Sequence, residues 1–248
     1  MTTKFNFIFE RLLILTLIVC FSLPVIAIEQ KNLKNEMHTL HAKSVDNKNI
    51  EITSDAKKLA KTLSEILTYQ AEFEQSVYRE NSTTPAISKG KFVIQRPNHF
   101  IWNTTQPFEQ NIIADGDNLW TYDPELEQVT IQDQQSILAD SPLLLLTSSV
   151  ESLVQAFDIV QVNQGKNDHN KNQQLFSLTP RENSIFESVH ILIEEDRIKE
   201  FFLLDTLGGR SGVVFNDIEV NQTVDLKLFI FSPPEGTDVI DSRQPFTN

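Results

Sequence analysis

Cysteine is nearly absent from this 248-residue chain, in which Cys20 is the single one. One cysteine excludes an internal disulfide framework and any metal site built from several cysteines. Basic residues are also few: 21 Lys and Arg stand against 34 Asp and Glu, for a formal net charge of -13. This balance argues against a nucleic-acid partner, because phosphate contacts need a basic face. Stability must come from packing, for which the 40% of hydrophobic residues suffices.

Catalytic and nucleotide-binding motifs are missing as well. The sequence has no G-x-S-x-G, no H-E-x-x-H, no P-loop and no G-x-G-x-x-G. His38 and His41 could hold a metal on a helix, but no carboxylate-rich ligand set lies near them. Asp115-Gly116-Asp117 resembles a fragment of a calcium loop, yet a hairpin turn explains it more simply. We therefore expect no enzyme, no bound metal and no cofactor.

The N-terminus is typical of a secretory signal peptide. An apolar run over residues 12–23 follows a basic start, and a small residue, Ala27, marks the expected cleavage site. The run is shorter than the roughly 20 residues that span a bilayer as a helix. Cys20 could instead be the acylated cysteine of a membrane-anchored lipoprotein, but the bulky Val19 before it fits such a signal poorly. We predict a signal peptide over residues 1–27 and an exported mature chain.

Residues 28–53 are polar and carry mixed charge without periodicity, so we predict a flexible extension there. The globular part is then expected over residues 54–248. It begins with a helix that starts near Ser54, and the spacing of four apolar residues puts them on one helical face. These residues are Leu59, Leu63, Ile66 and Leu67.

From Phe73 onward the apolar residues recur with a period of two, which predicts about ten or eleven short strands, the last over residues 225–231. Asp115-Gly116 indicates a tight hairpin turn. Two helices are expected between the strands, one over residues 140–146 and one after the capping-box pattern Ser148-x-x-Glu151. A twisted antiparallel sheet of this size curls or closes, so the helices would cover one face or mouth of it.

One motif draws attention because it sets a single cation beside apolar strands. Arg96 precedes Pro97-Asn98-His99-Phe100. A buried arginine would need hydrogen-bond acceptors such as the carbonyl groups at a helix C-terminus, whereas an exposed one would simply end a strand. The residues alone leave both interpretations open.

The same stretch resembles the LolA family of periplasmic lipoprotein carriers, and the resemblance continues in order along residues 54–243. Its later pieces are a lid-helix sequence that begins at Ser141-Pro142 and a C-terminal segment from Phe229 to Gly236. The earlier pieces, which precede Ser141, are Arg96-Pro97-Asn98-His99-Phe100-Ile101-Trp102, Gln106-Pro107, Asp115-Gly116, Leu119-Trp120, Tyr122-Asp123-Pro124 and Glu127-Gln128-Val129-Thr130.

This resemblance implies a mainly β fold with α-helices, namely an incomplete, unclosed antiparallel β-barrel covered by a helical lid. It further implies that Arg96 bonds to the lid helices when the protein is empty and is released when cargo enters. The concave face would form a cavity for acyl chains, which need no chemistry to be held. The candidate lining residues, each of which could equally be plain core packing, are Leu63, Leu67, Phe100, Trp102, Leu143, Leu144, Leu145 and Leu146.

By the same resemblance, the protein would be a monomer that takes acylated lipoproteins from an inner-membrane ABC-type release complex. It would cross the periplasm and deliver them to an outer-membrane receptor. Two other functions use the same half-barrel. A membrane-anchored receptor of the LolB type would carry an acylated N-terminal cysteine, and a periplasmic lipid-sensing regulator would carry a second domain.

Overall fold

The structure is a computed structural model, and it describes residues 52–79, 82–134, 150–162, 172–182 and 184–243. Several predicted segments therefore lie outside the described residues. They are the signal peptide over 1–27, the extension up to residue 51 and the lid segment over 140–146.

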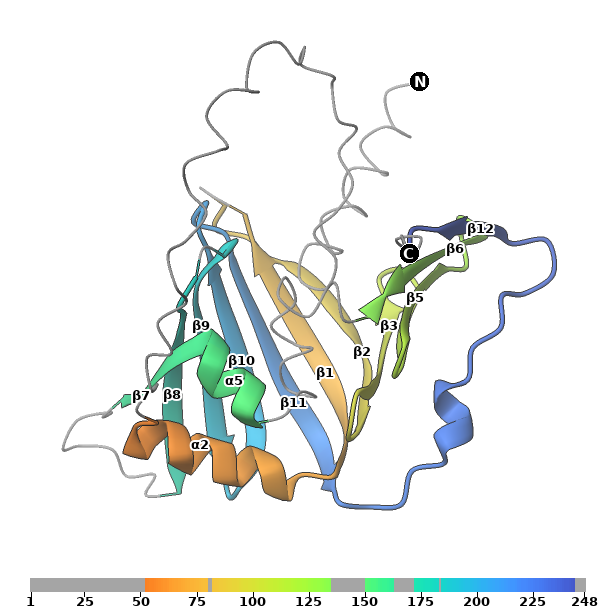
Figure 1. Ribbon diagram of the computed structural model, residues 1–248. Coiled ribbons are helices and arrows are strands. Elements are labelled where there is room, and N and C mark those ends of the chain that lie inside the picture. The colour runs from red at the N-terminus through yellow and green to blue at the C-terminus, as the bar shows by residue number, and fades with distance from the viewer. Residues whose placement is uncertain (1–51, 80–81, 135–149, 163–171, 183, 244–248) are drawn as a thin grey trace, which may run out of the picture.

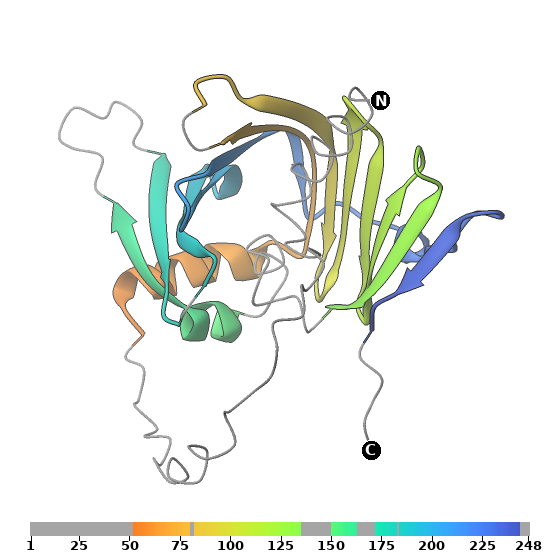
Figure 2. The same cartoon turned by 90° about the horizontal axis from the view of Figure 1, so that it is seen from above.

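Within the described part of the chain, twelve strands form one continuous sheet in the order β12-β6-β5-β4-β3-β2-β1-β11-β10-β9-β8-β7. Neighbours pair antiparallel except β12 with β6, which are parallel. The order begins and ends on different strands, and Figure 2 shows the sheet curling round without closing. The predicted unclosed barrel is thus confirmed. The strands are β1 (Thr68–Tyr78), β2 (Ala86–Gln95), β3 (His99–Gln106), β4 (Gln110–Asp115), β5 (Asn118–Asp123), β6 (Gln128–Asp133), β7 (Phe157–Val162), β8 (Gln173–Pro180), β9 (Phe186–Glu194), β10 (Arg197–Asp205), β11 (Arg210–Val220) and β12 (Asp238–Asp241).

The turn between β4 and β5 forms where the sequence predicts it. Gly116 has a φ of 106°, which a residue with a side chain rarely adopts. One carboxylate oxygen of Asp115 accepts hydrogen bonds from the backbone N–H groups of Asp117 and Asn118, and the other accepts one from the indole N–H of Trp120 at 2.7 Å. The aspartate therefore fixes both the turn and the strand that follows it.

Helix α2 (Ser54–Glu65) begins where the sequence predicts it, with Thr53 as its N-cap. The Thr53 hydroxyl accepts a hydrogen bond from the Ala56 N–H at 3.1 Å, which satisfies one of the free donors of the first turn. The helix is tied to the edge strand β7, because the Asp55 carboxylate accepts a hydrogen bond from the Gln161 N–H at 2.9 Å.

Helix α2 ends before the last two residues of the predicted apolar face, Ile66 and Leu67. The helix ends at Glu65, and Ile66 is already extended but remains buried. Leu67 lies beyond the helix with 60% of its surface exposed, and its N–H donates to the Asn221 side chain at 2.7 Å. The change from helical to extended geometry leaves Leu67 off the buried helical face, so its predicted place on that face was wrong, and its role in lining the cavity stays a prediction.

Helix α5 (Val150–Ala156) lies directly before β7, as predicted, and Ser148 of the proposed capping box lies outside the described residues. Helices α2 and α5 lie side by side over the β7 end of the concave face (Figure 1). Leu153 and Val154 of α5 are buried in the same apolar cluster as Leu59 and Leu63 of α2. The two helices thus cover part of the sheet.

The C-terminal segment differs from the prediction. Residues 225–231 do not form a strand; they contain a short 3-10 helix, η2 (Leu226–Phe229), capped by the Asp225 carboxylate. The chain then crosses the outer side of β3 and β4 and ends in β12 beside β6 (Figure 1). Phe229 is buried against His99, and the ring of Phe231 lies 5.6 Å from that of Trp120.

Candidate functional site

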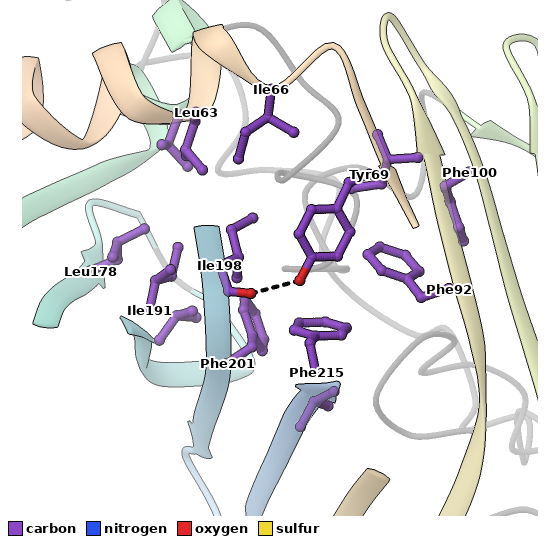
Figure 3. Packing of buried hydrophobic residues seen from close by; sticks show 14 of the residues in the cluster. Leu63, Ile66, Tyr69, Phe92, Phe100, Leu178, Ile191, Ile198, Phe201 and Phe215 are labelled. Atoms are coloured by element: carbon purple, nitrogen blue, oxygen red, sulfur yellow. Dashed lines mark hydrogen bonds between the residues drawn. The ribbon is translucent and has the colours of Figure 1, made fainter. Parts of the chain in front are cut away.

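Every second residue of the central strands points to the concave side of the sheet, which we call the inner wall. Strand pairing aligns these residues in rows, so that Ile94, for example, lies between Tyr69 on β1 and Phe100 on β3. The buried apolar residues among them form one cluster, part of which Figure 3 shows. Its members on the strands are Tyr69, Ala71, Phe73, Phe92, Ile94, Phe100, Trp102, Ile112, Ala114, Leu119, Phe157, Ile159, Phe176, Leu178, Phe186, Val189, Ile191, Ile193, Ile198, Phe201, Leu203, Val213 and Phe215.

Aromatic rings dominate the middle of the inner wall. Phe73 stacks on Trp102 with a centroid distance of 3.9 Å, and Phe92 stacks on Phe215 at 5.5 Å. Tyr69 meets Phe215 edge to face at 5.6 Å. Such rings provide a large apolar surface with few rotatable bonds. The wall can therefore hold flexible apolar groups without ordering many side chains of its own.

The inner wall offers little acid-base chemistry. Among the described members of the apolar cluster, the ionisable side chain is that of Tyr69, and burial raises the pKa of Tyr69 although Arg197 acts to lower it. The phenol donates a hydrogen bond of 2.6 Å to the carbonyl oxygen of Ile198. Across the described residues, no group of three or more His, Cys, Asp and Glu is arranged to hold a metal ion. The wall is suited to binding apolar groups.

The structure gathers three of the predicted cavity residues and leaves the others apart. Phe100 and Trp102 lie on the inner wall, and Leu63 of α2 packs in the same cluster. Leu67 is exposed, as described above. The lid residues Leu143, Leu144, Leu145 and Leu146 lie outside the described residues.

Arg96 follows the last residue of β2 and is half-buried. Its backbone N–H donates to the carbonyl oxygen of Leu67 at 2.9 Å, which places it beside the chain that leaves α2. Burial lowers the pKa of Arg96 to about 10. The guanidinium therefore stays charged at neutral pH, and it can donate to carbonyl groups at a helix end.

Sequence reasoning missed the polar members of the inner wall. Gln75 follows Tyr69, Ala71 and Phe73 in the alternation of β1, and it is buried together with its cross-strand neighbour Ser88. The period of two that identifies the apolar residues also predicts that Gln75 points inward. A glutamine at an inward position of an otherwise apolar alternation was therefore a signal available in the sequence.

No helix within the described ranges is both long and apolar enough to cross a membrane.

An open curved sheet with an apolar, aromatic inner wall, partly covered by two helices, defines a class of proteins that bind apolar ligands on the concave side.

Comparison with known proteins gives the family. Residues 64–232 match the family model described as outer membrane lipoprotein carrier protein LolA. The chain is 33% identical over 189 residues to the outer-membrane lipoprotein carrier protein of Chromohalobacter salexigens, which covers 76% of this chain and 87% of that protein. The carrier protein of Pseudomonas putida strain GB-1 is 33% identical over 187 residues, 75% of this chain and 87% of its own. The protein belongs to the LolA family, and the resemblance inferred from its sequence is confirmed.

A crystal structure of a LolA superfamily protein from Nitrosomonas europaea is also similar. It shares 12% sequence identity with a TM-score of 0.44, and the match covers 72% of this chain and 99% of that one.

Proposed function

We propose that the protein is a periplasmic carrier that binds the acyl chains of lipoproteins released from the inner membrane and delivers them to an outer-membrane receptor. The observation that carries this proposal is the inner wall, a continuous apolar surface on the concave side of an unclosed sheet. Membership of the carrier family supports the same function.

Apolar burial supplies the binding energy. Each methylene removed from water contributes ~0.8 kcal/mol, so an acyl chain of ~14 methylenes gains roughly 11 kcal/mol before costs. Part of this gain is offset, because Leu59 and Leu63 of α2 and Leu153 of α5 already pack against the wall. Acyl chains must displace such contacts, so cargo binding is coupled to opening of the helical cover.

Arg96 is proposed as the latch of this cover. It is cationic at neutral pH and lies beside the segment that joins α2 to β1. In the empty protein its guanidinium would bond to the lid helices, and cargo would release it. Leu143, Leu144, Leu145 and Leu146 are proposed to lie on the lid over the acyl chains, with Leu63, Phe100 and Trp102 beneath them.

The partners follow from this function. The sequence has no nucleotide-binding motif, so energy would enter at an ABC-type release complex in the inner membrane. The net charge of -13 opposes retention on anionic membrane surfaces and suits a monomeric shuttle.

The test is a transfer assay in two steps. Inner-membrane vesicles that hold the release complex and a labelled lipoprotein receive ATP and the mature protein, and the vesicles are then sedimented. We expect the lipoprotein in the supernatant in a one-to-one complex, followed by its transfer to added outer membranes. A variant on the outer side of β7, Val160→Asp, should release and transfer the lipoprotein as the wild type does.

Two results would contradict a soluble carrier. Recovery of the protein with membranes, with Cys20 acylated in an intact mass spectrum, would indicate a receptor. Lipid binding without any release of lipoprotein from the vesicles would indicate a lipid-sensing regulator.

A further inference from the structure

A pair of polar side chains interrupts the apolar inner wall. Gln75 on β1 lies opposite Ser88 on β2 in the strand register, and the two are only 1% and 2% exposed. The Ser88 hydroxyl donates to the Gln75 Oε1 at 3.0 Å. This bond fixes the amide so that its nitrogen, Nε2, is the atom left to find a partner.

Within the described residues, Gln75 Nε2 has no hydrogen-bond acceptor although it is fully shielded from solvent. Buried polar groups are nearly always hydrogen-bonded, so an unpaired buried donor needs a physical reason. Three other side-chain atoms on the inner wall share this condition, namely Thr121 Oγ1, Gln132 Oε1 and Gln174 Oε1. Those residues are less buried than Gln75, and two of the three atoms are acceptors.

The position of Gln75 on the wall is specific. Its cross-strand neighbour on β11 is Val213, and the preceding inward residue of β1 is Phe73, whose ring stacks on Trp102. Helix α2 lies at the other end of β1, directly before the strand begins at Thr68 (Figure 1). Strand β1 rises about 20 Å from Tyr69 to Gln75 at ~3.3 Å per residue. An aromatic surface as long as an extended acyl chain therefore separates the helix from the amide.

The chemistry of the cargo matches this arrangement. The lipid anchor of a lipoprotein consists of apolar chains joined to the polypeptide through ester and amide linkages, each with a carbonyl oxygen. Such an oxygen accepts hydrogen bonds but cannot leave water without finding a donor. A single donor at one end of an apolar wall satisfies that requirement once per cargo.

Resting on the proposed carrier function, we propose that Gln75, oriented by Ser88, donates a hydrogen bond from Nε2 to a carbonyl oxygen of the cargo's acyl linkage. The acyl chains then extend from Gln75 along Phe73 and Trp102 toward α2, and the polypeptide leaves at the Gln75 end. The bond selects acyl linkages over plain hydrocarbon and sets how deeply the anchor enters.

The experiment compares three lipopeptides of equal chain length with the full mature protein. The first has two ester-linked chains and one amide-linked chain, the second has ether linkages in place of the esters, and the third lacks the amide-linked chain. If an ester carbonyl is the acceptor, we expect wild type to bind the first lipopeptide roughly tenfold more tightly than the second. If the amide carbonyl is the acceptor, we expect wild type to bind the first roughly tenfold more tightly than the third, after allowance for the binding energy of the missing chain.

The matching variant replaces both members of the pair, Gln75→Leu with Ser88→Ala, because an apolar pair of similar shape leaves no new unpaired group. We expect it to unfold cooperatively and to bind the ester and ether lipopeptides equally well. Thr104→Val, at another buried polar position of the wall, should keep the wild-type preference.

A second readout needs no variant. This readout is the NMR signal of the Gln75 side-chain amide in wild type. If an ester carbonyl is the acceptor, the signal should shift on addition of the ester lipopeptide and not of the ether form. If the amide carbonyl is the acceptor, the signal should shift with the two lipopeptides that carry the amide-linked chain and not with the third, which lacks it. Equal affinity of wild type for all three lipopeptides, with an unshifted Gln75 signal, would overturn this inference and leave the carrier function standing. Failure of wild type to bind any of them would overturn both.

Discussion

The hydroxyl of Tyr69 on β1 bonds to the carbonyl oxygen of Ile198 on β10 at 2.6 Å, although β11 lies between these two strands. The bond spans the concave side of the sheet, as the dashed line in Figure 3 shows. It ties together strands that are not neighbours, and so holds the curvature that makes one face of the sheet an enclosure.

Tyr69→Phe removes this bond and little else. We expect the free energy of unfolding to fall by about 1–2 kcal/mol, because the Ile198 carbonyl loses a buried partner. Urea denaturation measures the change. Tyr122→Phe on the outer side of β5, where the ring lies 5.7 Å from that of Phe231, is the control with little effect. Equal losses in the two variants would show that the cross-strand bond has no special role.

Asp115→Asn tests the β4–β5 turn through its pH dependence. Burial raises the pKa of Asp115, but hydrogen bonds from Trp120, Asn118 and Asp117 lower it more, so the net pKa lies below the ordinary 3.8. A carboxylate with a lowered pKa stabilises the fold above that ordinary value and ceases to do so as the pH falls through its folded value.

We therefore expect Asp115→Asn to cost about 1–2 kcal/mol at pH 7 and progressively less below pH ~4. Unfolding curves at pH 7, 5 and 3 measure this difference. Asp117→Asn, in the same turn but exposed, is the control and should show no such loss at pH 7. A loss at Asp115 that is constant across this range would assign the effect to packing instead of charge.

Much of the fold could be predicted because its patterns are local. Alternation identifies the inward residues from Phe92 to Trp102, and Asp115-Gly116 fixes a turn within a few residues of chain. The failures occur where a distant contact decides the outcome. Leu67 continues the helical spacing, yet Asn221, far along the sequence, binds its N–H and begins the strand instead.

The C-terminus shows a second kind of failure. Leu226, Leu228 and Ile230 alternate with buried Phe229 and so imitate a strand, but they are exposed residues in and after a 3-10 helix. Strand β12 was missed because all its side chains are exposed, which leaves no apolar alternation to detect. The pair of Gln75 and Ser88 lies on strands the sequence does predict, and only the register shows that they meet.

Two deletions that differ by two residues test where the polar extension ends and the folded part begins. Thr53 caps α2, and its hydroxyl also donates to the Ile159 carbonyl at 3.4 Å. Deleting residues 28–51 should leave thermal unfolding unchanged, whereas deleting residues 28–53 should cost about 1 kcal/mol through loss of the cap. Thr53→Ala in the undeleted chain should reproduce that second loss. A cooperative loss on the shorter deletion would show that the extension is structured.

The leucines that we propose to lie on the lid give a prediction about loading. With that placement, Leu144→Asp or Leu145→Asp puts a charge in an apolar enclosure, so lipoprotein binding should fall at least tenfold in the vesicle release assay. Leu207→Asp is the control, since Leu207 is 80% exposed in the turn between β10 and β11. Unchanged binding by both lid variants would remove these leucines from the site.

Arg96→Leu separates loading from release. Arg96 is charged at neutral pH, and its backbone N–H bonds to the chain that leaves α2. Removal of its guanidinium should leave the inner wall intact while removing the bonds that we propose it makes to the lid helices in the empty protein. The variant should accept lipoprotein from inner-membrane vesicles as wild type does, but transfer it to outer membranes several-fold less. Arg197→Leu, at an exposed position at the start of β10, is the charge-matched control and should transfer normally. Because closing of the cover is what would expel the cargo, normal transfer by Arg96→Leu would mean that some other contact closes it.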